Sequence, residues 1–546
     1  MRQHPFLLVT LTVLSIFLPH TLAYSADADS SALHTEFMVE MRDGVNLATS
    51  VYLPEGDGPW PAVVTRTPYN KEGYGRQAPR FNEEDYVFIA QDSRGKFRSE
   101  GEYFPFESDM PDGYDTIEWI AAQPFCNGKV GITGASAMGI AGNLAAAANP
   151  PHLVAAFVVV APEGLFHQSR FIGGVFKESH AGGWMRRQGA GDQIPAMLKR
   201  VVMDDKWKAV DFLYHRHKVD IPMYNVAGWY DIFAEGGLNN FKWLQEEGLE
   251  GARGNQKILV GPFGHGALSG GLEYPDPGGI RGNSDEEMRW FAYWLKGEDN
   301  GIMDEPPVRY YMMAAAKKDA ASSKNRYIEA DSWPPESTLQ RYYLSKNYGL
   351  STSKPREAGP MTTYRFDPES PVPTIGGMNL NLKKGPMDQR GIEERPDYLR
   401  FQTPPLEEDV VIAGRIDVEL WASTDGLDTD FMVKLVDVYP DGYEAIVLDN
   451  PLRARYRHGR NREDVKMMTP GEPEKLIIDL WSTALTFEKG HRIAVHVTSS
   501  NFPRFEVNAN TGEAPGEFEI PPRVANNTIY YDSKYPSAIV LPVVSQ

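Results

Sequence analysis

The sequence has almost no cysteine. Cys126 is the single cysteine among 546 residues, which excludes a disulfide within the chain and a cysteine-rich zinc site. Stability must therefore come from burial of apolar surface, which a chain of this length permits in two or three domains. Cys126 has no catalytic context around it and is expected to be a small buried residue. We expect neither a metal site nor a cofactor.

The chain also lacks an excess of basic residues. Lys and Arg number 55 against 74 Asp and Glu, which gives a formal net charge of -19 at pH 7. Nucleic-acid binding depends on clustered Lys and Arg that displace counterions from phosphates. The charge balance therefore argues against a nucleic-acid partner, although it says little about fold or substrate.

Long hydrophobic runs are missing apart from one near the N-terminus. The run 6–18 (FLLVTLTVLSIFL) follows Arg2 and precedes small residues at Ala23 and Ala28. This order predicts a secretory signal peptide over residues 1–28, cleaved after one of these alanines. The 13-residue run is too short to cross a bilayer of ~30 Å as a helix, although a retained membrane anchor is the alternative. We expect an exported protein, periplasmic or secreted, with no membrane contact in its mature form.

Between residues 29 and 161, short β-branched runs alternate with helix-like segments. Such runs suit strands that are buried on both faces of a parallel sheet. The helix-like segment 113–122 carries an apolar stripe at Ile117, Ile120 and Ala121. The alternation predicts an α/β domain. The predicted strands are 62–65, 86–91 and 129–133, and the predicted helices are 113–122 and 139–148.

Residues 162–220 break this pattern. They are rich in Gly, His, Arg and Met, include a helix-like piece at 196–203, and contain no clear strand. We expect a helical cap inserted over an active site. The α/β pattern then resumes over residues 221–303, which form the second part of the core. Its predicted elements are strands 222–226 and 257–260 and helix 285–296.

The last part of the chain, residues 304–546, changes to alternation of apolar and polar residues. A polar stretch with Gly and Pro at 297–307 precedes it and predicts a domain boundary. Many alternating strands without helices between them predict an antiparallel β-sandwich or jelly roll. The clearest predicted strands are 416–422, 431–438, 476–480 and 492–498.

Ser136 lies in the motif GASAMG, which follows a predicted strand and opens a predicted helix. This is the context of a nucleophile elbow, a sharp strand-to-helix turn that projects a serine. The backbone N–H of Ala137 would then lie at the helix N-terminus, where it can stabilise an oxyanion. Met138 replaces the glycine usual two residues after the serine, and Gly139 follows one position later. A tight turn capped by Ser136 is the alternative.

A serine nucleophile needs a base, because its hydroxyl is unreactive at its free pKa. In α/β-hydrolases the partners follow in the order serine, acid, histidine, each directly after a strand. Asp231 follows the predicted strand 222–226, and His265 follows 257–260. His265 would accept the Ser136 proton and pass it to the leaving group, while Asp231 would fix the imidazole tautomer. The three residues form a predicted catalytic triad.

Short blocks around these residues carry a family likeness. They are 66–71 (RTPYNK), 91–95 (QDSRG), 99–101 (SEG), 112–119 (DGYDTIEW), 123–131 (QPFCNGKVG) and 294–297 (WLKG). With the triad, they resemble the cocaine esterase and X-prolyl dipeptidyl peptidase (CocE/NonD) family of serine hydrolases. The resemblance implies an α/β-hydrolase domain with a helical cap insertion, followed by a C-terminal β jelly-roll domain. It also matches Tyr69 to the tyrosine whose hydroxyl joins the oxyanion hole beside the Ala137 N–H.

The chain departs from the family pattern in its predicted pocket. Family members usually carry an aromatic residue directly after the nucleophile, where this chain has Ala137, so the pocket should be roomier or differently shaped. The amino-acid ester hydrolases of this group hold the substrate ammonium with a carboxylate cluster. Two of its members lie just after the catalytic acid, where this chain has Phe233 and Ala234. The apolar residues Trp229 and Phe233 instead predict an uncharged acyl pocket.

We therefore expect an exported serine hydrolase that cleaves a carboxylic ester through an acyl-enzyme intermediate. The same triad serves an amide hydrolase, either an X-prolyl dipeptidyl peptidase or an acylase of the glutaryl or α-amino acid type. The peptidase needs an acidic clamp for a free amine, for which Glu163 and Glu178 are candidates. A binding protein that uses the jelly-roll domain without catalysis is a remote alternative. The expected partner is a small-molecule ester or amide, and homo-oligomer formation is left open.

Overall fold

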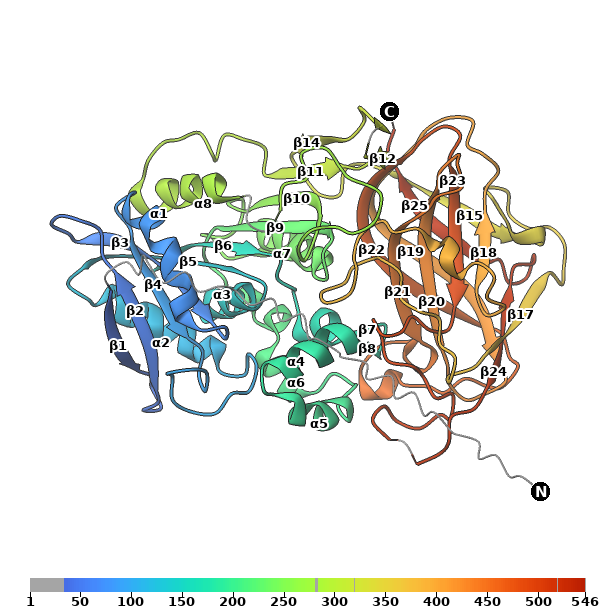
Figure 1. Ribbon diagram of the computed structural model, residues 1–546, viewed down its shortest axis with the longest axis horizontal. Helices are drawn as coiled ribbons and strands as arrows, with labels where there is room; N and C mark the ends of the chain where they lie inside the picture. The colour runs from blue at the N-terminus through green and yellow to red at the C-terminus, as the bar shows by residue number, and fades with distance from the viewer. Residues whose placement is uncertain (1–33, 280–282, 319, 518, 546) are drawn as a thin grey trace, which may run out of the picture.

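The computed structural model describes residues 34–279, 283–318, 320–517 and 519–545. Two blocks lie side by side in Figure 1: a mixed sheet with helices, and a β-sandwich built from the C-terminal part of the chain. The predicted signal peptide, residues 1–28, lies outside the described residues. Within the described part of the chain, no helix is both long and apolar enough to cross a bilayer.

A ten-stranded sheet forms the centre of the first block. Its seven inner strands are parallel, and the strands at its two ends are antiparallel to their neighbours. The five strands predicted before residue 304 correspond to β3, β4, β5, β9 and β10. In spatial order the strands are β1 (Thr35–Glu40), β2 (Asn46–Tyr52), β4 (Val87–Asp92), β3 (Trp60–Thr67), β5 (Cys126–Ala135), β6 (Leu153–Val159), β9 (Met223–Tyr230), β10 (Lys257–Gly264), β11 (Val308–Met312) and β14 (Arg326–Ala330).

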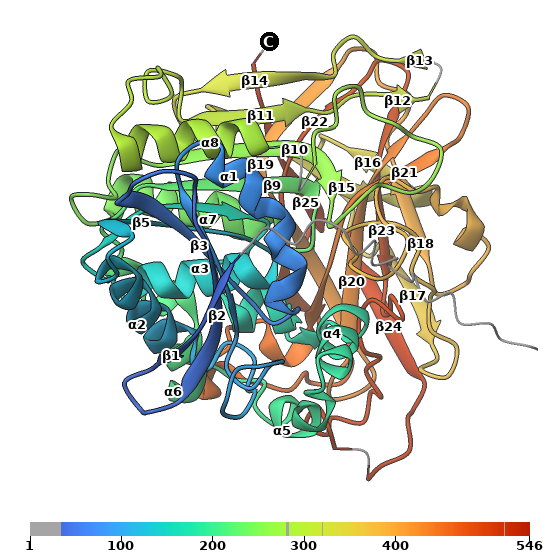
Figure 2. The same ribbon diagram turned by 60° about the vertical axis from the view of Figure 1, so that its left-hand side comes forward.

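Helices cover both faces of this sheet. They are α1 (Ala78–Asn82), α2 (Asp109–Ala121), α3 (Ala137–Ala147), α7 (Ala234–Glu247) and α8 (Ser284–Phe291). Figure 2 shows α2 and α3 on one side of the sheet and α8 on the other. The predicted apolar stripe is confirmed at Ile117 and Ile120, two residues of α2 whose side chains are completely buried. Gly113 lets α2 approach α3, because a Cβ there would lie 2.6 Å from the Cβ of Ala145. On the opposite face, Trp290 of α8 is fully buried.

The insertion between β6 and β9 is mostly helical, as predicted for residues 162–220. Its helices are α4 (Gly183–Arg187), α5 (Ile194–Leu198) and α6 (Asp205–Val210), joined by single helical turns. It also contains a hairpin that the sequence analysis did not predict, β7 (Phe171–Ile172) and β8 (Val175–Phe176). Gly173 and Gly174 form its turn with φ of 56° and 81°, a region that favours glycine. The Gly173 carbonyl accepts a hydrogen bond from the Arg453 N–H at 2.7 Å, so the hairpin ties the cap to the C-terminal block.

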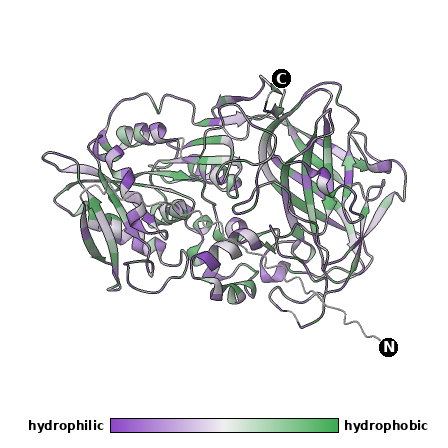
Figure 3. Ribbon diagram, viewed as in Figure 1, coloured by the Kyte–Doolittle hydropathy of each residue, from purple (hydrophilic) through white to green (hydrophobic). Residues whose placement is uncertain are grey.

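The C-terminal block is the predicted β-sandwich. Its predicted strands lie within β19, β20, β22 and β23, and nearly all of its pairings are antiparallel. Figure 3 shows the strands of both blocks coloured largely as hydrophobic. The strands of the sandwich are β15 (Thr338–Ser345), β16 (Gly349–Ser351), β17 (Met361–Phe366), β18 (Leu399–Gln402), β19 (Val410–Thr424), β20 (Asp430–Val438), β21 (Glu444–Arg453), β22 (Glu474–Phe487), β23 (Arg492–Thr498), β24 (Ala525–Tyr530) and β25 (Ala538–Val543), and the small hairpin β12 (Ala316–Lys317) and β13 (Ala320–Ala321) precedes them.

The predicted boundary at 303/304 falls inside the first sheet and has to be corrected. β11 pairs in parallel with β10, and β14 pairs antiparallel with β11. The first sheet therefore runs on to Ala330, and the sandwich begins at Thr338. The polar stretch 297–307 is the loop that joins the helix of residues 284–296 to β11. Gly and Pro mark a loop within a domain as strongly as a linker between domains.

Candidate active site

Ser136 lies alone in the turn between β5 and α3, as the elbow prediction requires. Its backbone has φ 60° and ψ -121°, a conformation that costs a non-glycine residue about 1–3 kcal/mol. A Cβ at Gly134 would lie 2.5 Å from the backbone of Met138, so only glycine permits so tight a turn. The Ser136 N–H donates to the Val159 carbonyl at 2.9 Å, which holds the strained residue against β6.

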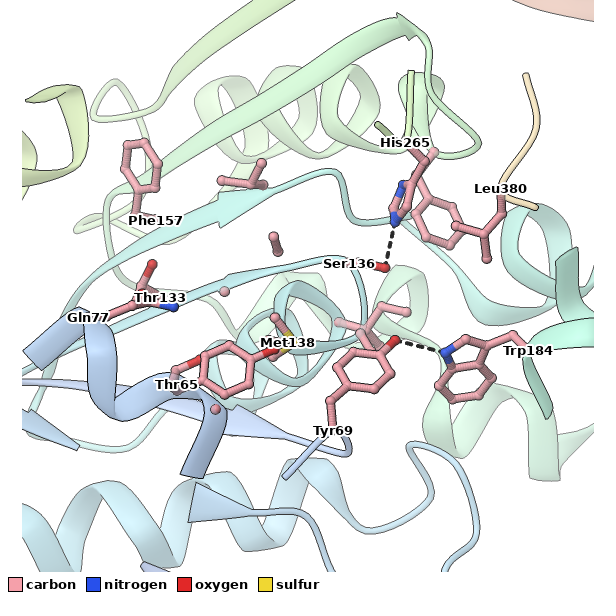
Figure 4. Close-up of a pocket in the computed structure, with 18 of the residues that line it drawn as sticks. Thr65, Tyr69, Gln77, Thr133, Ser136, Met138, Phe157, Trp184, His265 and Leu380 are labelled. Atoms are coloured by element: carbon pink, nitrogen blue, oxygen red, sulfur yellow. Dashed lines mark hydrogen bonds between the residues drawn. The ribbon is translucent and has the colours of Figure 1, made fainter. Parts of the chain in front are cut away.

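The three predicted triad residues form one chain of hydrogen bonds. His265 Nε2 lies 2.8 Å from Ser136 Oγ, as Figure 4 shows, and His265 Nδ1 lies 2.7 Å from Asp231 Oδ2. Asp231 Oδ1 accepts a further bond from the Phe233 N–H at 2.8 Å. Asp231 follows β9 and His265 follows β10, so both lie at the carboxyl edge of neighbouring parallel strands. In this arrangement the imidazole can accept the serine proton while the carboxylate holds its other nitrogen.

A buried lysine of the cap holds the loop that carries Asp231. Lys177 Nζ donates to the carbonyls of Gln168 and Ile232 at 2.8 Å and 3.1 Å. Burial lowers the pKa of Lys177 well below its usual range, although the nearby Asp231 carboxylate opposes the shift. Lys177 was not predicted, because a lysine in an insertion without periodic pattern gives no signal of its burial.

Tyr69 and Ala137 lie where an oxyanion hole is expected. Trp184 Nε1 donates a hydrogen bond of 2.8 Å to the Tyr69 hydroxyl oxygen (Figure 4), so the phenol proton remains available to another acceptor. Burial raises the pKa of Tyr69 and outweighs the opposing hydrogen bond from Trp184, which keeps the phenol protonated. Ala137 opens α3, where a backbone N–H has no acceptor within the helix. Trp184 comes from α4 and is a site residue that the sequence analysis missed.

A cavity of about 950 Å³ opens onto Ser136 and His265. Its walls come from the core, the cap and the C-terminal block, which contributes Leu380 and Asn381. Phe233 lies in this wall as predicted, with its ring 6.0 Å from the His265 ring and nearly perpendicular to it. The site therefore depends on all three parts of the chain.

Trp229 does not line the cavity, and its assignment to the substrate pocket was wrong. It lies in β9 with 1% of its surface exposed, and its indole N–H donates to the Tyr311 carbonyl of β11 at 2.7 Å. Its ring packs against Trp333 at 5.5 Å. Successive side chains of a strand point to opposite faces, so closeness to Asp231 in sequence did not place Trp229 on the pocket side.

Neither candidate for an amine clamp lines the cavity. Glu163 is held by Gln168, Asn239 and Arg216, and burial raises the pKa of its carboxyl. Glu178 pairs with Arg186 at 2.5 Å on the outside of the cap. Among the described residues that line the cavity, Glu287 alone carries a carboxylate, and Thr133 and Arg80 both bind it. This described part of the wall thus offers no unpaired carboxylate to a substrate ammonium.

Known proteins match most of the chain. The sequence profile of the X-Pro dipeptidyl-peptidase (S15) family matches residues 43–202, and that of the X-Pro dipeptidyl-peptidase C-terminal non-catalytic domain matches residues 300–540. Cocaine esterase from Rhodococcus sp. (strain MB1 Bresler) is 30% identical over 583 aligned positions, which cover 93% of this chain and 98% of the relative.

Two solved structures share the fold over nearly their full length. An aminopeptidase from a marine sediment Thaumarchaeota archaeon superposes with a TM-score of 0.81 at 25% identity, covering 94% of this chain and 97% of the other. An α-amino acid ester hydrolase superposes with a TM-score of 0.79 at 25% identity, covering 98% of this chain and all of the other (100%). The chain is therefore a serine hydrolase of the cocaine esterase and X-Pro dipeptidyl-peptidase (CocE/NonD) family, as its sequence blocks predicted.

Proposed function

We propose that this protein is an exported carboxylic-ester hydrolase whose nucleophile is Ser136. The observation that carries the proposal is the unbroken hydrogen-bond chain from Ser136 through His265 to Asp231, which faces the cavity. Export rests on the N-terminal sequence pattern alone. The family contains both esterases and peptidases, and the cavity wall bears on this choice through the substrates that carry a free amine.

The reaction follows from the groups at hand. His265 accepts the hydroxyl proton as Ser136 Oγ attacks the ester carbonyl, and Asp231 stabilises the imidazolium. The tetrahedral oxyanion accepts hydrogen bonds from the Tyr69 hydroxyl and the Ala137 N–H. His265 then protonates the leaving alcohol, which departs and leaves an acyl-serine. A water molecule, deprotonated by His265, attacks this ester by the same route and releases the acid.

The cavity wall argues against substrates with a free amine. An X-Pro dipeptide or an α-amino ester presents an ammonium, which needs a carboxylate partner when it leaves water. Phe233 and Ala234 follow Asp231, and Glu287 is already bonded to Thr133 and Arg80. We therefore rank an ester without an α-amine above a dipeptide.

A substrate panel tests this choice. Phenyl esters of simple acids should be hydrolysed with kcat/KM well above that of an X-Pro anilide or an α-amino acyl amide of the same leaving-group class. A fluorophosphonate probe should label the protein, and peptide mapping should find the label on Ser136. Faster cleavage of the X-Pro anilide would contradict the ester assignment, and a label on another residue would contradict the nucleophile.

Removal of the Tyr69 hydroxyl should slow turnover of a phenyl ester. Tyr69→Phe keeps the ring but takes away one of two oxyanion donors, so kcat should fall by about 100-fold with little change in KM. Trp184→Phe serves as the matched control, because it removes the indole N–H that positions Tyr69 but leaves the phenol proton in place. The control should lose less activity than Tyr69→Phe. An unchanged kcat in Tyr69→Phe would remove Tyr69 from the oxyanion hole.

A further inference from the structure

One wall of the active-site cavity carries a buried cation without a counter-ion. Arg170 has 4% of its surface exposed and lines the cavity beside Ser169. Its side chain makes a single hydrogen bond, from Nη1 to Ser169 Oγ at 3.0 Å. Within the described ranges, no carboxylate lies within ion-pair distance of its guanidinium. A buried, uncompensated charge is costly, so a position of this kind needs an explanation.

Aromatic rings compensate this charge only in part. The Arg170 guanidinium carbon lies 5.8 Å from the Phe106 ring centre and 5.6 Å from that of Trp184. These two rings are stacked on each other at 5.6 Å. Cation–π contacts of this kind are worth much less than an ion pair with a carboxylate. Burial lowers the pKa of Arg170 to about 10, which still leaves the guanidinium positive at neutral pH.

The position of this cation relative to the triad decides which half of a substrate it would meet. Arg170 contacts Trp184, and Trp184 donates to Tyr69 of the proposed oxyanion hole. Figure 4 shows Tyr69 and Trp184 on one side of Ser136 and His265 on the other. The leaving group must lie beside His265, which protonates it. The wall that contains Arg170 therefore lies on the side left to the acyl group.

We propose that the acyl group of the substrate ends in a carboxylate that Arg170 and Ser169 bind, so that the enzyme cleaves monoesters of dicarboxylic acids. This rests on the proposed function and specifies its substrate class. The carboxylate would accept two hydrogen bonds from the guanidinium fork and a third from the Ser169 hydroxyl, whose proton is free because the oxygen accepts from Arg170. It takes no part in the acyl transfer, in which the bond to Ser136 Oγ forms and the bond to the alcohol breaks. The uncharged acyl pocket predicted from sequence is thereby replaced by a cationic one.

Matched pairs of esters test the proposal. Phenol release is measured from phenyl hydrogen glutarate and phenyl hydrogen adipate, and from the same two compounds with the free acid capped as a methyl ester. The uncatalysed rate is subtracted, because a neighbouring carboxylate can hydrolyse a phenyl ester by itself. The wild-type protein should show a kcat/KM at least about 10-fold higher for the free acid than for the capped ester, for at least one chain length.

Arg170→Met should remove this preference. We expect kcat/KM for the free acid to fall by about 30-fold or more and that for the capped ester to change by less than about 5-fold. The matched control is Arg186→Gln, which removes one exposed positive charge from helix α4 of the same cap, at a residue that pairs with Glu178 and does not line the cavity. This control should change both rates by less than about 5-fold. Arg170→Lys keeps the positive charge but lacks the paired N–H groups of the guanidinium, so it should retain part of the preference for the free acid over the capped ester. If Arg170→Met does not fold, Arg170→Lys is the variant that tests the proposal.

The outcomes separate this inference from the proposed function. Equal or better wild-type turnover of the capped esters at both chain lengths would overturn the carboxylate site, as would an equal loss on both esters in a folded Arg170→Met. Either result leaves Ser136-dependent ester hydrolysis intact. No hydrolysis of any of the four esters, together with no fluorophosphonate label on Ser136, would instead overturn the proposed function.

Discussion

Ser136→Ala should abolish ester hydrolysis, with kcat lower by about 10⁴- to 10⁶-fold. The hydroxyl of this residue is placed to receive the acyl chain, because its oxygen lies 2.8 Å from His265 Nε2, which can take its proton. Cavity and oxyanion donors remain, so a small residual rate above that in water is expected. The measurement is initial velocity on a phenyl ester, beside circular dichroism of the purified variant. A folded Ser136→Ala with substantial activity would contradict the assignment.

Ser136→Gly is the informative control for this variant. It is equally without a nucleophile, but glycine has no Cβ to strain at φ 60° and ψ -121°. Its free energy of unfolding should therefore exceed that of Ser136→Ala by about 1–3 kcal/mol. Equal stability of the two variants, measured by denaturant unfolding, would show that the turn relaxes when the serine is replaced.

Asp231→Asn should lower kcat by about 10⁴-fold while the protein stays folded. The carboxylate accepts two hydrogen bonds, one from His265 Nδ1 at 2.7 Å and one from the Phe233 N–H at 2.8 Å. An amide can accept on one side only. If its NH₂ faces His265, the imidazole proton moves to Nε2, which then cannot accept from Ser136. If its oxygen faces His265, the NH₂ opposes the Phe233 N–H and the loop moves.

Asp211→Asn is the matched control for Asp231→Asn. Asp211 is also fully buried and accepts from two backbone N–H groups, those of Phe166 and Leu213, but it lies in the cap and touches no triad residue. It should lose stability by about 1–3 kcal/mol and keep kcat within about 5-fold of wild type. A loss of activity in Asp211→Asn as large as in Asp231→Asn would mean that buried carboxylates act here through folding alone.

The parts of the site that follow from local rules could be predicted from the sequence. Strand periodicity together with chain order placed Ser136, Asp231 and His265, because each comes directly after a buried strand, and the structure brings them together. The cap residues gave no such signal. Trp184 and Arg170 lie in a segment of short turns without a repeating apolar pattern, so their burial depends on contacts far away in sequence.

Two errors have the same physical origin. Trp229 was assigned to the pocket from its distance along the chain to Asp231, although neighbouring strand residues face opposite ways. The boundary at 303/304 was assigned from Gly and Pro, although β11 with its alternating pattern adds to the first sheet beside β10. In both cases a local sequence pattern was used to predict which parts of the chain lie next to each other. Neighbours in a sheet are set by pairing between strands that are far apart in sequence, which a local pattern does not show.

The continuation of the first sheet through β11 and β14 also affects when the catalytic domain can finish folding during synthesis. His265 follows β10, and β10 has β11 as its outer neighbour. During synthesis on the ribosome, β10 has an unpaired edge until β11, residues 308–312, has emerged. An unpaired strand edge can pair with another chain and start aggregation. The unfinished protein is therefore exposed to aggregation until the first strand of the region that matches the C-terminal domain profile, residues 300–540, has been made. The catalytic sheet and the C-terminal region match separate sequence profiles, but the sheet cannot be completed before the C-terminal region has begun to fold.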